Sequence, residues 1–164
     1  MASQRTLVVV RHAKSDWGQA VPDEERQLNE RGRREAPLIG RWLADHTDHV
    51  DGLDLVICST ATRAQQTWRL AGAETEPTVR VRYDERVYAA GPRELMSVLD
   101  ELADDIGTAA LVGHNPGLTE LVETLTNQSV ELKTSALAVL RWEGTWADVW
   151  TRRAALVTHA TPRE

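Results

Sequence analysis

Short apolar runs alternate with longer amphipathic stretches along this chain. The runs near 6–11, 53–58 and 109–113 are mostly apolar, a pattern that predicts short strands buried on both faces of a sheet. Between them, apolar residues recur at three- and four-residue spacing, which predicts helices with one buried stripe. Buried strands that alternate with amphipathic helices are typical of an α/β architecture with a mostly parallel sheet.

Four such helices are expected. Asn29 caps the first, Gly72 ends the second, and Gly91-Pro92 and Asn115-Pro116 open the third and fourth. The apolar stripes of the four helices consist of Leu38, Ile39, Trp42 and Leu43; Ala61, Ala64, Trp68 and Ala71; Leu95, Val98, Leu99 and Leu102; and Leu118, Leu121, Val122 and Leu125. Each stripe gives its helix one face to bury against the sheet.

Three further strands complete the expected sheet. Residues 79–83 alternate between apolar and arginine side chains, which predicts a strand with one solvated face near a sheet edge. Residues 135–142 and 147–158 are expected to form strands on either side of a turn at Glu143-Gly144. No repeat, low-complexity tract or linker divides the chain. The sequence therefore predicts one domain over 1–164, with a doubly wound, mostly parallel sheet and helices on both faces.

The composition fits an ordinary globular protein, because 164 residues with 41% hydrophobic and 27% charged content can build one core. The formal net charge of −6 and the pI near 5.4 argue against binding to nucleic acids or anionic membranes, which needs a basic surface. Cys58 is the only cysteine, so no internal disulfide forms, and the first apolar run is too short for a signal peptide or a membrane span. We therefore expect a soluble cytoplasmic protein.

Polar and charged side chains follow each of the three buried runs. Arg11-His12 ends the first run. Ser59 and Arg63 follow the second run, and His114-Asn115 follows the third. The carboxyl ends of parallel strands meet at one edge of a sheet, where α/β proteins bind ligands. Arg63 and His114 also lie where a helix begins, and helix amino termini attract anions. The sequence therefore predicts a phosphate site at this edge.

The residue types at this edge suit phosphoryl transfer. Arg11 and Arg63 can bind phosphoryl oxygens in bidentate fashion and take the place of a metal ion, so we expect neither a metal nor a cofactor. His12 can attack phosphorus if a backbone carbonyl holds its other ring nitrogen. His114 would donate a hydrogen bond to a phosphoryl oxygen, most usefully when charged, and Ser15 is a candidate to line the phosphate pocket.

The candidate residues lie in three short motifs: Arg11-His12-Ala13, the segment 59–67 with its Arg63-Ala64, and Gly113-His114-Asn115-Pro116-Gly117. These motifs resemble the histidine phosphatase superfamily, which has a phosphoglycerate-mutase-like fold. Further segments are similar to the short SixA-type branch, the phosphohistidine phosphatases, and these are 11–15, 26–29 with Gly32, 84–88 and 134–136. The resemblance spans about 7–160 and implies the family fold without a lid insertion, for which the chain is too short.

The resemblance also implies roles for individual residues. His12 would be the nucleophile, and Arg11, Arg63 and His114 would form the phosphate pocket. The family's acidic proton donor is carried to Glu85. The neighbouring Asp84 stays open as an alternative, because adjacent residues of an extended loop point in different directions.

Two positions depart from the family pattern. Ala13 stands where the superfamily usually has glycine, and Gln27 stands where the branch often has proline. Ala13 fits if its φ is negative.

The expected function is therefore that of a metal-independent phosphatase that forms a covalent phosphohistidine and removes phosphate from phosphohistidine on a protein. An open site suits a protein-borne phosphate, and the imidazole of phosphohistidine leaves as a neutral group once its distal nitrogen is protonated. A small-molecule phosphate-ester phosphatase or a phosphoglycerate-type mutase is the enzymatic alternative. A catalytically silent phosphate-binding module is the alternative of another class. The expected partner is a phosphorylated protein or small phosphorylated substrate, and inorganic phosphate or sulfate would fit the site.

Overall fold

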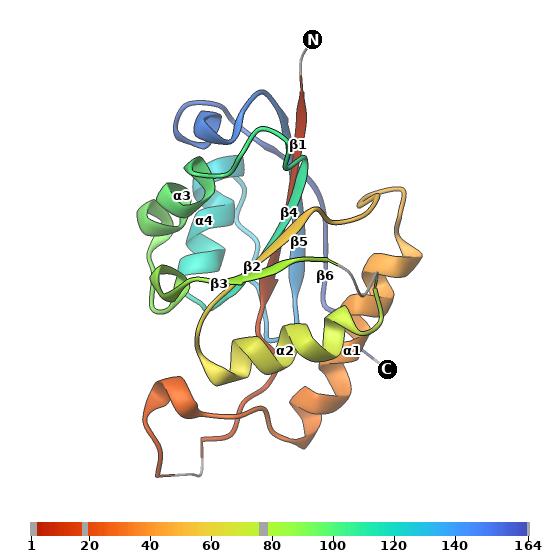
Figure 1. Cartoon of the computed structure of the whole chain (residues 1–164), viewed down its shortest axis with the longest axis vertical. Helices are drawn as coiled ribbons and strands as arrows, with labels where there is room; N and C mark the ends of the chain where they lie inside the picture. The colour runs from red at the N-terminus through yellow and green to blue at the C-terminus, as the bar shows by residue number, and fades with distance from the viewer. Residues whose placement is uncertain (1–2, 18–19, 76–78, 164) are drawn as a thin grey trace.

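The computed structural model describes residues 3–17, 20–75 and 79–163. Its centre is a six-stranded sheet in the order β3-β2-β4-β1-β5-β6 (Figure 1). The strands are β1 (Gln4–Arg11), β2 (Leu55–Cys58), β3 (Val81–Tyr83), β4 (Thr108–Gly113), β5 (Leu137–Glu143) and β6 (Ala155–Ala160). Strands β1 to β4 are parallel to one another, whereas β5 and β6 run antiparallel to their neighbours. The predicted mostly parallel sheet is confirmed.

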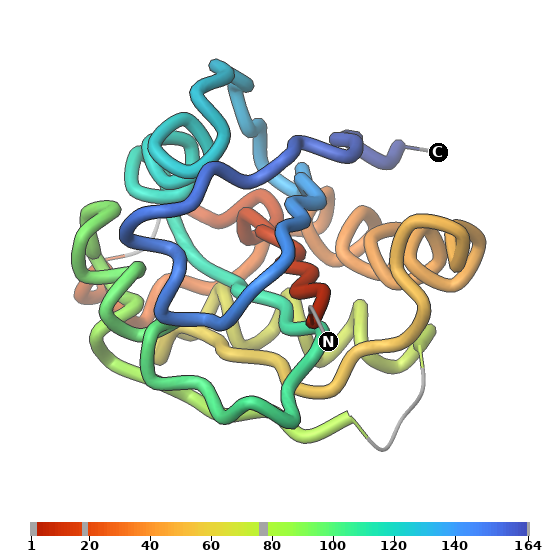
Figure 2. Tube along the Cα trace, turned by 90° about the horizontal axis from the view of Figure 1, so that it is seen from above, coloured from red at the N-terminus to blue at the C-terminus, as the bar shows by residue number. Residues whose placement is uncertain are grey.

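Two helices pack on each face of the sheet (Figures 1 and 2). α1 (Glu30–Asp45) and α2 (Thr62–Gly72) pack on one face, and α3 (Pro92–Asp100) and α4 (Gly117–Thr126) pack on the other. Successive residues of β1 point to opposite faces, so Val8 and Val10 join the core under α1 and α2, whereas Leu7 and Val9 join the core under α3 and α4. The predicted α/β architecture is confirmed.

The helix ends follow the local signals in the sequence. Asn29 caps α1, because its side-chain oxygen accepts a hydrogen bond from the Gly32 N–H at 2.8 Å. α2 ends at Gly72, and α3 begins at Pro92 directly after Gly91. α4 begins directly after Asn115-Pro116. Within the described ranges, no helix is long and apolar enough to cross a membrane.

The expected strand over 147–158 is wrong in its first part. Residues Trp146–Trp150 form a short 3-10 helix, and β6 begins only at Ala155. Thr145 and Asp148 form a capping box that starts this turn, with the Thr145 N–H donating to the Asp148 carboxylate at 2.8 Å. Trp146 and Val149 are therefore both buried at a three-residue spacing, instead of alternating across a strand.

Strand register brings the candidate residues together. Arg11 at the end of β1 lies opposite Gly113 of β4, and Cys58 at the end of β2 lies opposite Val112. The next residues along these three strands are His12, Ser59 and His114. They emerge side by side at one edge of the sheet, where the sequence predicts the site.

Candidate active site

His12 leaves β1 with its imidazole buried and its two ring nitrogens in different settings. Its Nδ1 lies 2.7 Å from the carbonyl oxygen of Ala13, a contact that requires the proton on Nδ1. The lone pair of the ring is therefore on Nε2, which lies 3.4 Å from Nε of Arg63. This is the carbonyl-held imidazole that nucleophilic attack on phosphorus needs.

The His12 ring is neutral in the free protein. Burial lowers its pKa to about 3, and the neighbouring His114, Arg63 and Arg11 act in the same direction, whereas the hydrogen bond to Ala13 opposes them. A neutral imidazole carries the lone pair that a nucleophile needs, so burial and positive neighbours give His12 the protonation state that its predicted role requires at neutral pH.

Arg63 lies in the first turn of α2, with its side chain buried against His12. Thr67, one turn further along α2, connects this turn to the loop after β1. Its hydroxyl donates to the Arg63 carbonyl at 2.7 Å and accepts from the Ala13 N–H at 2.9 Å. The helix that carries the Arg63 guanidinium and the strand end that carries His12 are therefore fixed to each other. Ala13 does not have a positive φ, so the alanine fits where the superfamily usually has glycine.

His114 follows β4 and places its ring centroid 5.1 Å from that of His12. Its Nε2 lies 2.7 Å from the hydroxyl oxygen of Ser59, which also accepts from the Ala61 N–H. Its Nδ1 is buried and has no hydrogen-bond partner within the described part of the chain. Burial, reinforced by Arg63, lowers the pKa of His114 to about 4, so this ring is also neutral in the free protein.

Arg11 is half-buried at the end of β1. Its Nη1 donates to the Leu132 carbonyl at 3.0 Å, while its buried Nε has no partner among the described residues. A buried donor without an acceptor is costly, and a bound oxyanion would satisfy it.

A cavity of about 220 Å³ is lined by the four side chains that the sequence predicts to form the site, which are Arg11, His12, Arg63 and His114. Ser15 also lines it. The hydroxyl oxygen of Ser15 accepts a hydrogen bond from Nη1 of Arg26 at 2.7 Å, so another side chain of the cavity wall holds it in place. The structure thus brings together the two imidazoles and two guanidiniums that the sequence predicts. Their catalytic roles remain predictions.

Comparison with known proteins agrees with this geometry. A family model described as the histidine phosphatase superfamily (branch 1) matches residues 7–88. The chain belongs to this superfamily. The uncharacterized protein Rv1276c of Mycobacterium tuberculosis is 38% identical over 165 residues, which cover 94% of this chain and all of that protein. The resemblance inferred from the motifs is confirmed, and with it the enzyme class of a phosphatase.

Solved structures of SixA-type proteins share the fold of this histidine phosphatase. A candidate phosphohistidine phosphatase SixA from Nakamurella multipartitia is 30% identical with a TM-score of 0.86, and the match covers 99% of each chain. The protein histidine phosphatase SixA complexed with tungstate is 19% identical with a TM-score of 0.81, over 96% of this chain and 97% of that chain. A phosphohistidine phosphatase SixA homolog of Haemophilus influenzae is 24% identical over 93% of this chain and 98% of that protein.

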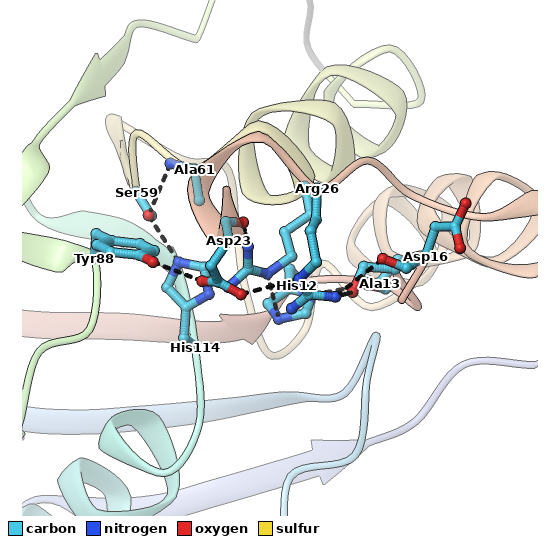
Figure 3. A network of polar contacts seen from close by, with 11 residues as sticks. His12, Ala13, Asp16, Asp23, Arg26, Ser59, Ala61, Tyr88 and His114 are labelled. Atoms are coloured by element: carbon cyan, nitrogen blue, oxygen red, sulfur yellow. Dashed lines mark hydrogen bonds and ion pairs between the residues drawn. The ribbon is translucent and has the colours of Figure 1, made fainter. Parts of the chain in front are cut away.

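Asp23 is the site residue that sequence reasoning missed. Figure 3 shows its carboxylate between Tyr88 and His12, in the middle of the network. It accepts hydrogen bonds from the Tyr88 hydroxyl at 2.6 Å, from Arg26 Nε at 2.9 Å and from Arg63 Nη2 at 3.0 Å. The Asp23 carbonyl also accepts from Arg63 Nη1 at 2.7 Å. These donors, Tyr88 first, hold the pKa of Asp23 well below its usual range, so it is a carboxylate in this histidine phosphatase.

Asp23 begins a short 3-10 helix, Asp23–Glu25, in a charged segment without hydrophobic periodicity, which is why the sequence pattern gave it no role. The available signal was its three-residue spacing from Arg26, the first residue of a segment already noted for its resemblance to the SixA-type branch.

The two predicted proton-donor candidates do not line the cavity that contains His12. Glu85 is exposed and lines neither of the two cavities beside His114 that the described residues form. Asp84 is held by Arg86, whose Nη2 lies 2.8 Å from the Asp84 carboxylate, and hydrogen bonds from Arg86 lower the pKa of Asp84. The assignment of Glu85 as proton donor stays a prediction. Among residues 3–17, 20–75 and 79–163, no group of three or more His, Cys, Asp or Glu side chains is arranged to hold a metal ion.

Proposed function

We propose that this histidine phosphatase removes the phosphoryl group from phosphohistidine on a protein, through a covalent phosphohistidine at His12 and without a metal ion. The observation that carries the proposal is the hydrogen bond from His12 Nδ1 to the Ala13 carbonyl at 2.7 Å. It fixes the tautomer and leaves Nε2 as the nucleophile beside Arg63.

In the first step, His12 Nε2 attacks phosphorus and the bond from phosphorus to the substrate nitrogen breaks. The electron pair of that bond stays on the leaving nitrogen. Arg11 and Arg63 stabilise the charge on the three equatorial oxygens, and His114 provides a further hydrogen bond. The two guanidiniums supply the positive charge that a metal ion supplies in many phosphotransferases.

The protonation states of Asp23 and Asp84 favour a phosphoramidate substrate over an ester. Asp23 is a carboxylate held by three donors, and Asp84 is paired with Arg86. An ester would need an acid to protonate its leaving alkoxide. The imidazole of phosphohistidine leaves as a neutral molecule when its distal nitrogen already carries a proton, so this reaction makes no such demand.

The same argument applies to the second step. Phosphorylated His12 keeps its proton on Nδ1, where the Ala13 carbonyl accepts it. When water attacks phosphorus, the bond from phosphorus to His12 Nε2 breaks, its electron pair stays on Nε2, and one proton of the water passes to a phosphoryl oxygen. His12 therefore departs as a neutral imidazole and the starting tautomer is restored. Both half reactions transfer a phosphoryl group away from an imidazole, which makes them chemically symmetrical.

The relatives support the same substrate class. A SixA-type protein described as a candidate phosphohistidine phosphatase and another described as a protein histidine phosphatase share this fold over nearly their whole length, and the second is a complex with tungstate, a tetrahedral oxyanion. A phosphoryl group is also a tetrahedral oxyanion, and the arginines of this site suit its oxygens.

A rapid-quench experiment tests the proposal. The protein is mixed with a ³²P-labelled phosphohistidine protein, with phosphoglycerate and with an aryl phosphate, each in the presence and absence of a chelator. We expect an acid-labile, base-stable phosphoenzyme and release of inorganic phosphate, fastest from phosphohistidine and unchanged by the chelator.

His12→Ala is the matched control. We expect it to abolish both the phosphoenzyme and turnover while its thermal midpoint stays close to that of the unaltered protein. Preference for phosphoglycerate, or transfer of phosphate to a second hydroxyl, would contradict the proposal and identify a small-molecule phosphate-ester phosphatase or a phosphoglycerate-type mutase. Binding of oxyanions without any phosphoenzyme or turnover would identify a silent phosphate-binding module.

A further inference from the structure

A second cavity, of about 380 Å³, adjoins the one that contains His12. The two cavities share four lining residues, which are Asp23, Arg63, His114 and Asn115. His12 lines the first cavity but not the second, as the described residues define them. In phosphoryl transfer the attacking and leaving atoms lie roughly in line on opposite sides of phosphorus. A group that leaves from phosphorus bound by Arg63 and His114 therefore departs away from His12.

Most of the remaining wall of this cavity, apart from Tyr88 and Glu120, is built from small residues. These small residues come from two segments, the loop after Tyr88 and the start of α4, and are Ala89, Ala90, Gly91, Pro116 and Gly117. Ala89 has a φ of 53°, a left-handed conformation that is uncommon for a residue with a side chain. Backbone strain of this kind persists where the surrounding structure enforces it and is concentrated at functional sites. The small side chains leave room for a flat ring.

Glu120 is the second acidic residue that lines this cavity, in the first turn of α4. Its carboxylate has no partner among residues 3–17, 20–75 and 79–163, whereas the carboxylate of Asp23 already accepts from Arg26, Arg63 and Tyr88. Glu120 is therefore the cavity carboxylate that remains available to a substrate.

We infer that this second cavity, lined by Tyr88, the 89–91 loop and the start of α4, holds the leaving group, and that Glu120 selects a leaving group with a protonated, positively charged ring. The inference rests on the proposed function and assigns a residue to the selection of its phosphoramidate substrate. The Glu120 carboxylate accepts a hydrogen bond from the distal N–H of the phosphorylated imidazole. It thereby stabilises the protonated ring from which phosphorus is transferred.

The step balances without a further reactant. The bond from phosphorus to the substrate nitrogen breaks, its electron pair stays on that nitrogen, and the new bond forms between phosphorus and His12 Nε2. The distal proton remains on the substrate imidazole, which leaves neutral with Glu120 still ionised. Glu120 donates no proton in this step.

Glu120 also acts against esters. An ester leaving group carries no positive charge and develops negative charge as its bond to phosphorus breaks. A carboxylate beside that oxygen is repulsive, so one side chain favours phosphoramidates and disfavours esters at the same time.

The test measures the ratio of kcat/KM for a 3-phosphohistidine peptide to kcat/KM for p-nitrophenyl phosphate. A carboxylate a few ångströms from a cation raises its pKa by about one unit, so we expect Glu120→Gln to lower this ratio about 10-fold. The alkaline limb of the pH profile for the peptide should move to lower pH by about one unit for the same reason. A residue that only supports the helix would not move this limb.

Glu123→Gln is the matched control, because Glu123 is exposed on the same helix and does not line the cavity formed by the described residues. We expect its ratio and pH profile to equal those of the unaltered protein. Equal ratios for all three proteins would overturn the role of Glu120 and leave the proposed function standing. Absence of phosphohistidine turnover by the unaltered protein would overturn the proposed function together with this inference.

Discussion

Burial lowers the pKa of both imidazoles of the site, which are His12 and His114. Burial brings the pKa of His12 to about 3 and that of His114 to about 4, and arginines beside each ring act in the same direction. In the free protein the site therefore presents neutral rings among positive charges. Binding of an oxyanion reverses the local field, which favours a proton on His114 just when a phosphoryl oxygen needs a donor.

Asp23 is expected to position Arg63, because it holds the two terminal nitrogens while Nε faces His12. Asp23→Asn removes the charge that fixes this orientation, so we expect kcat/KM for phosphohistidine to fall by about 10- to 100-fold, mainly through kcat. Tyr88→Phe, which removes the hydroxyl donor at 2.6 Å and keeps the ring, should give a smaller loss.

Steady-state kinetics, with inorganic phosphate as an inhibitor, separates the positioning role of Asp23 from a blocking role. If Asp23 instead blocks the phosphate position in the resting protein, Asp23→Asn will bind inorganic phosphate more tightly and will lose no turnover. That result would exclude a positioning role.

At the scale of the elements, the candidate site was predictable because it lies at strand ends. His12, Ser59 and His114 each follow an apolar run that only a buried strand explains, and parallel pairing places the three ends side by side. Asp23 and Tyr88 were not predictable in this way, because they reach the site from loops whose path depends on tertiary contacts. The misassigned turn at Trp146–Trp150 has a related cause, since buried residues three apart fit a short 3-10 helix as well as an irregular strand.

The contact between α4 and the 89–91 loop gives an element-scale prediction. A Cβ at Gly117 would collide with the carbonyl oxygen of Ala90, so Gly117→Ala must push the start of α4 away from the loop. We expect a loss of stability of about 1–3 kcal/mol together with reduced kcat/KM, because His114 and the second cavity both border this contact. Thermal unfolding and steady-state kinetics measure the two effects.

Gly40→Ala supplies the comparison, because a Cβ at Gly40 would collide with the Ala71 carbonyl oxygen where α1 packs on α2. We expect a similar fall in the thermal midpoint with kcat/KM of the folded protein unchanged. Equal losses of activity in both variants would show that the effect of Gly117→Ala comes from stability alone.

At the scale of the whole molecule, the net charge and the site have opposite signs. The chain carries a formal charge of −6, yet the described residues that line the cavity at His12 include four cationic side chains, which are Arg11, Lys14, Arg26 and Arg63, and one carboxylate, that of Asp23. The composition alone excluded a general polyanion surface. It carried no information on this local concentration of positive charge, which arises only when the fold brings the strand ends and the start of α2 together.

This local field predicts how pH and an oxyanion jointly affect stability. Ordinary histidines titrate near pH 6.5, whereas His12 and His114 titrate near pH 3 and 4 in the folded protein. Between these pH values the unfolded chain binds protons that the folded protein does not. The contribution of these two rings to the free energy of unfolding is therefore fully retained above pH 6.5 and decreases as the pH falls from 6.5 toward the folded-state pKa values.

Sulfate, which stays a dianion over this range, raises the pKa of both rings when it binds beside them. Its affinity and its stabilising effect should therefore grow as the pH falls from 7 to 5, even while the thermal midpoint of the free protein declines.

At a sulfate concentration of 100 times the dissociation constant we expect the free energy of unfolding to rise by about 2.7 kcal/mol, which raises the thermal midpoint by roughly 5–10 °C for a protein of this size. Thermal scans of the unaltered protein and of Arg63→Ala, with and without sulfate, separate site binding from general salt effects, because Arg63→Ala removes a buried side chain that is predicted to bind the anion and leaves the exposed charges unchanged. A sulfate shift that is equal in both proteins, or that shrinks as the pH falls, would contradict a phosphate site built on two buried neutral imidazoles.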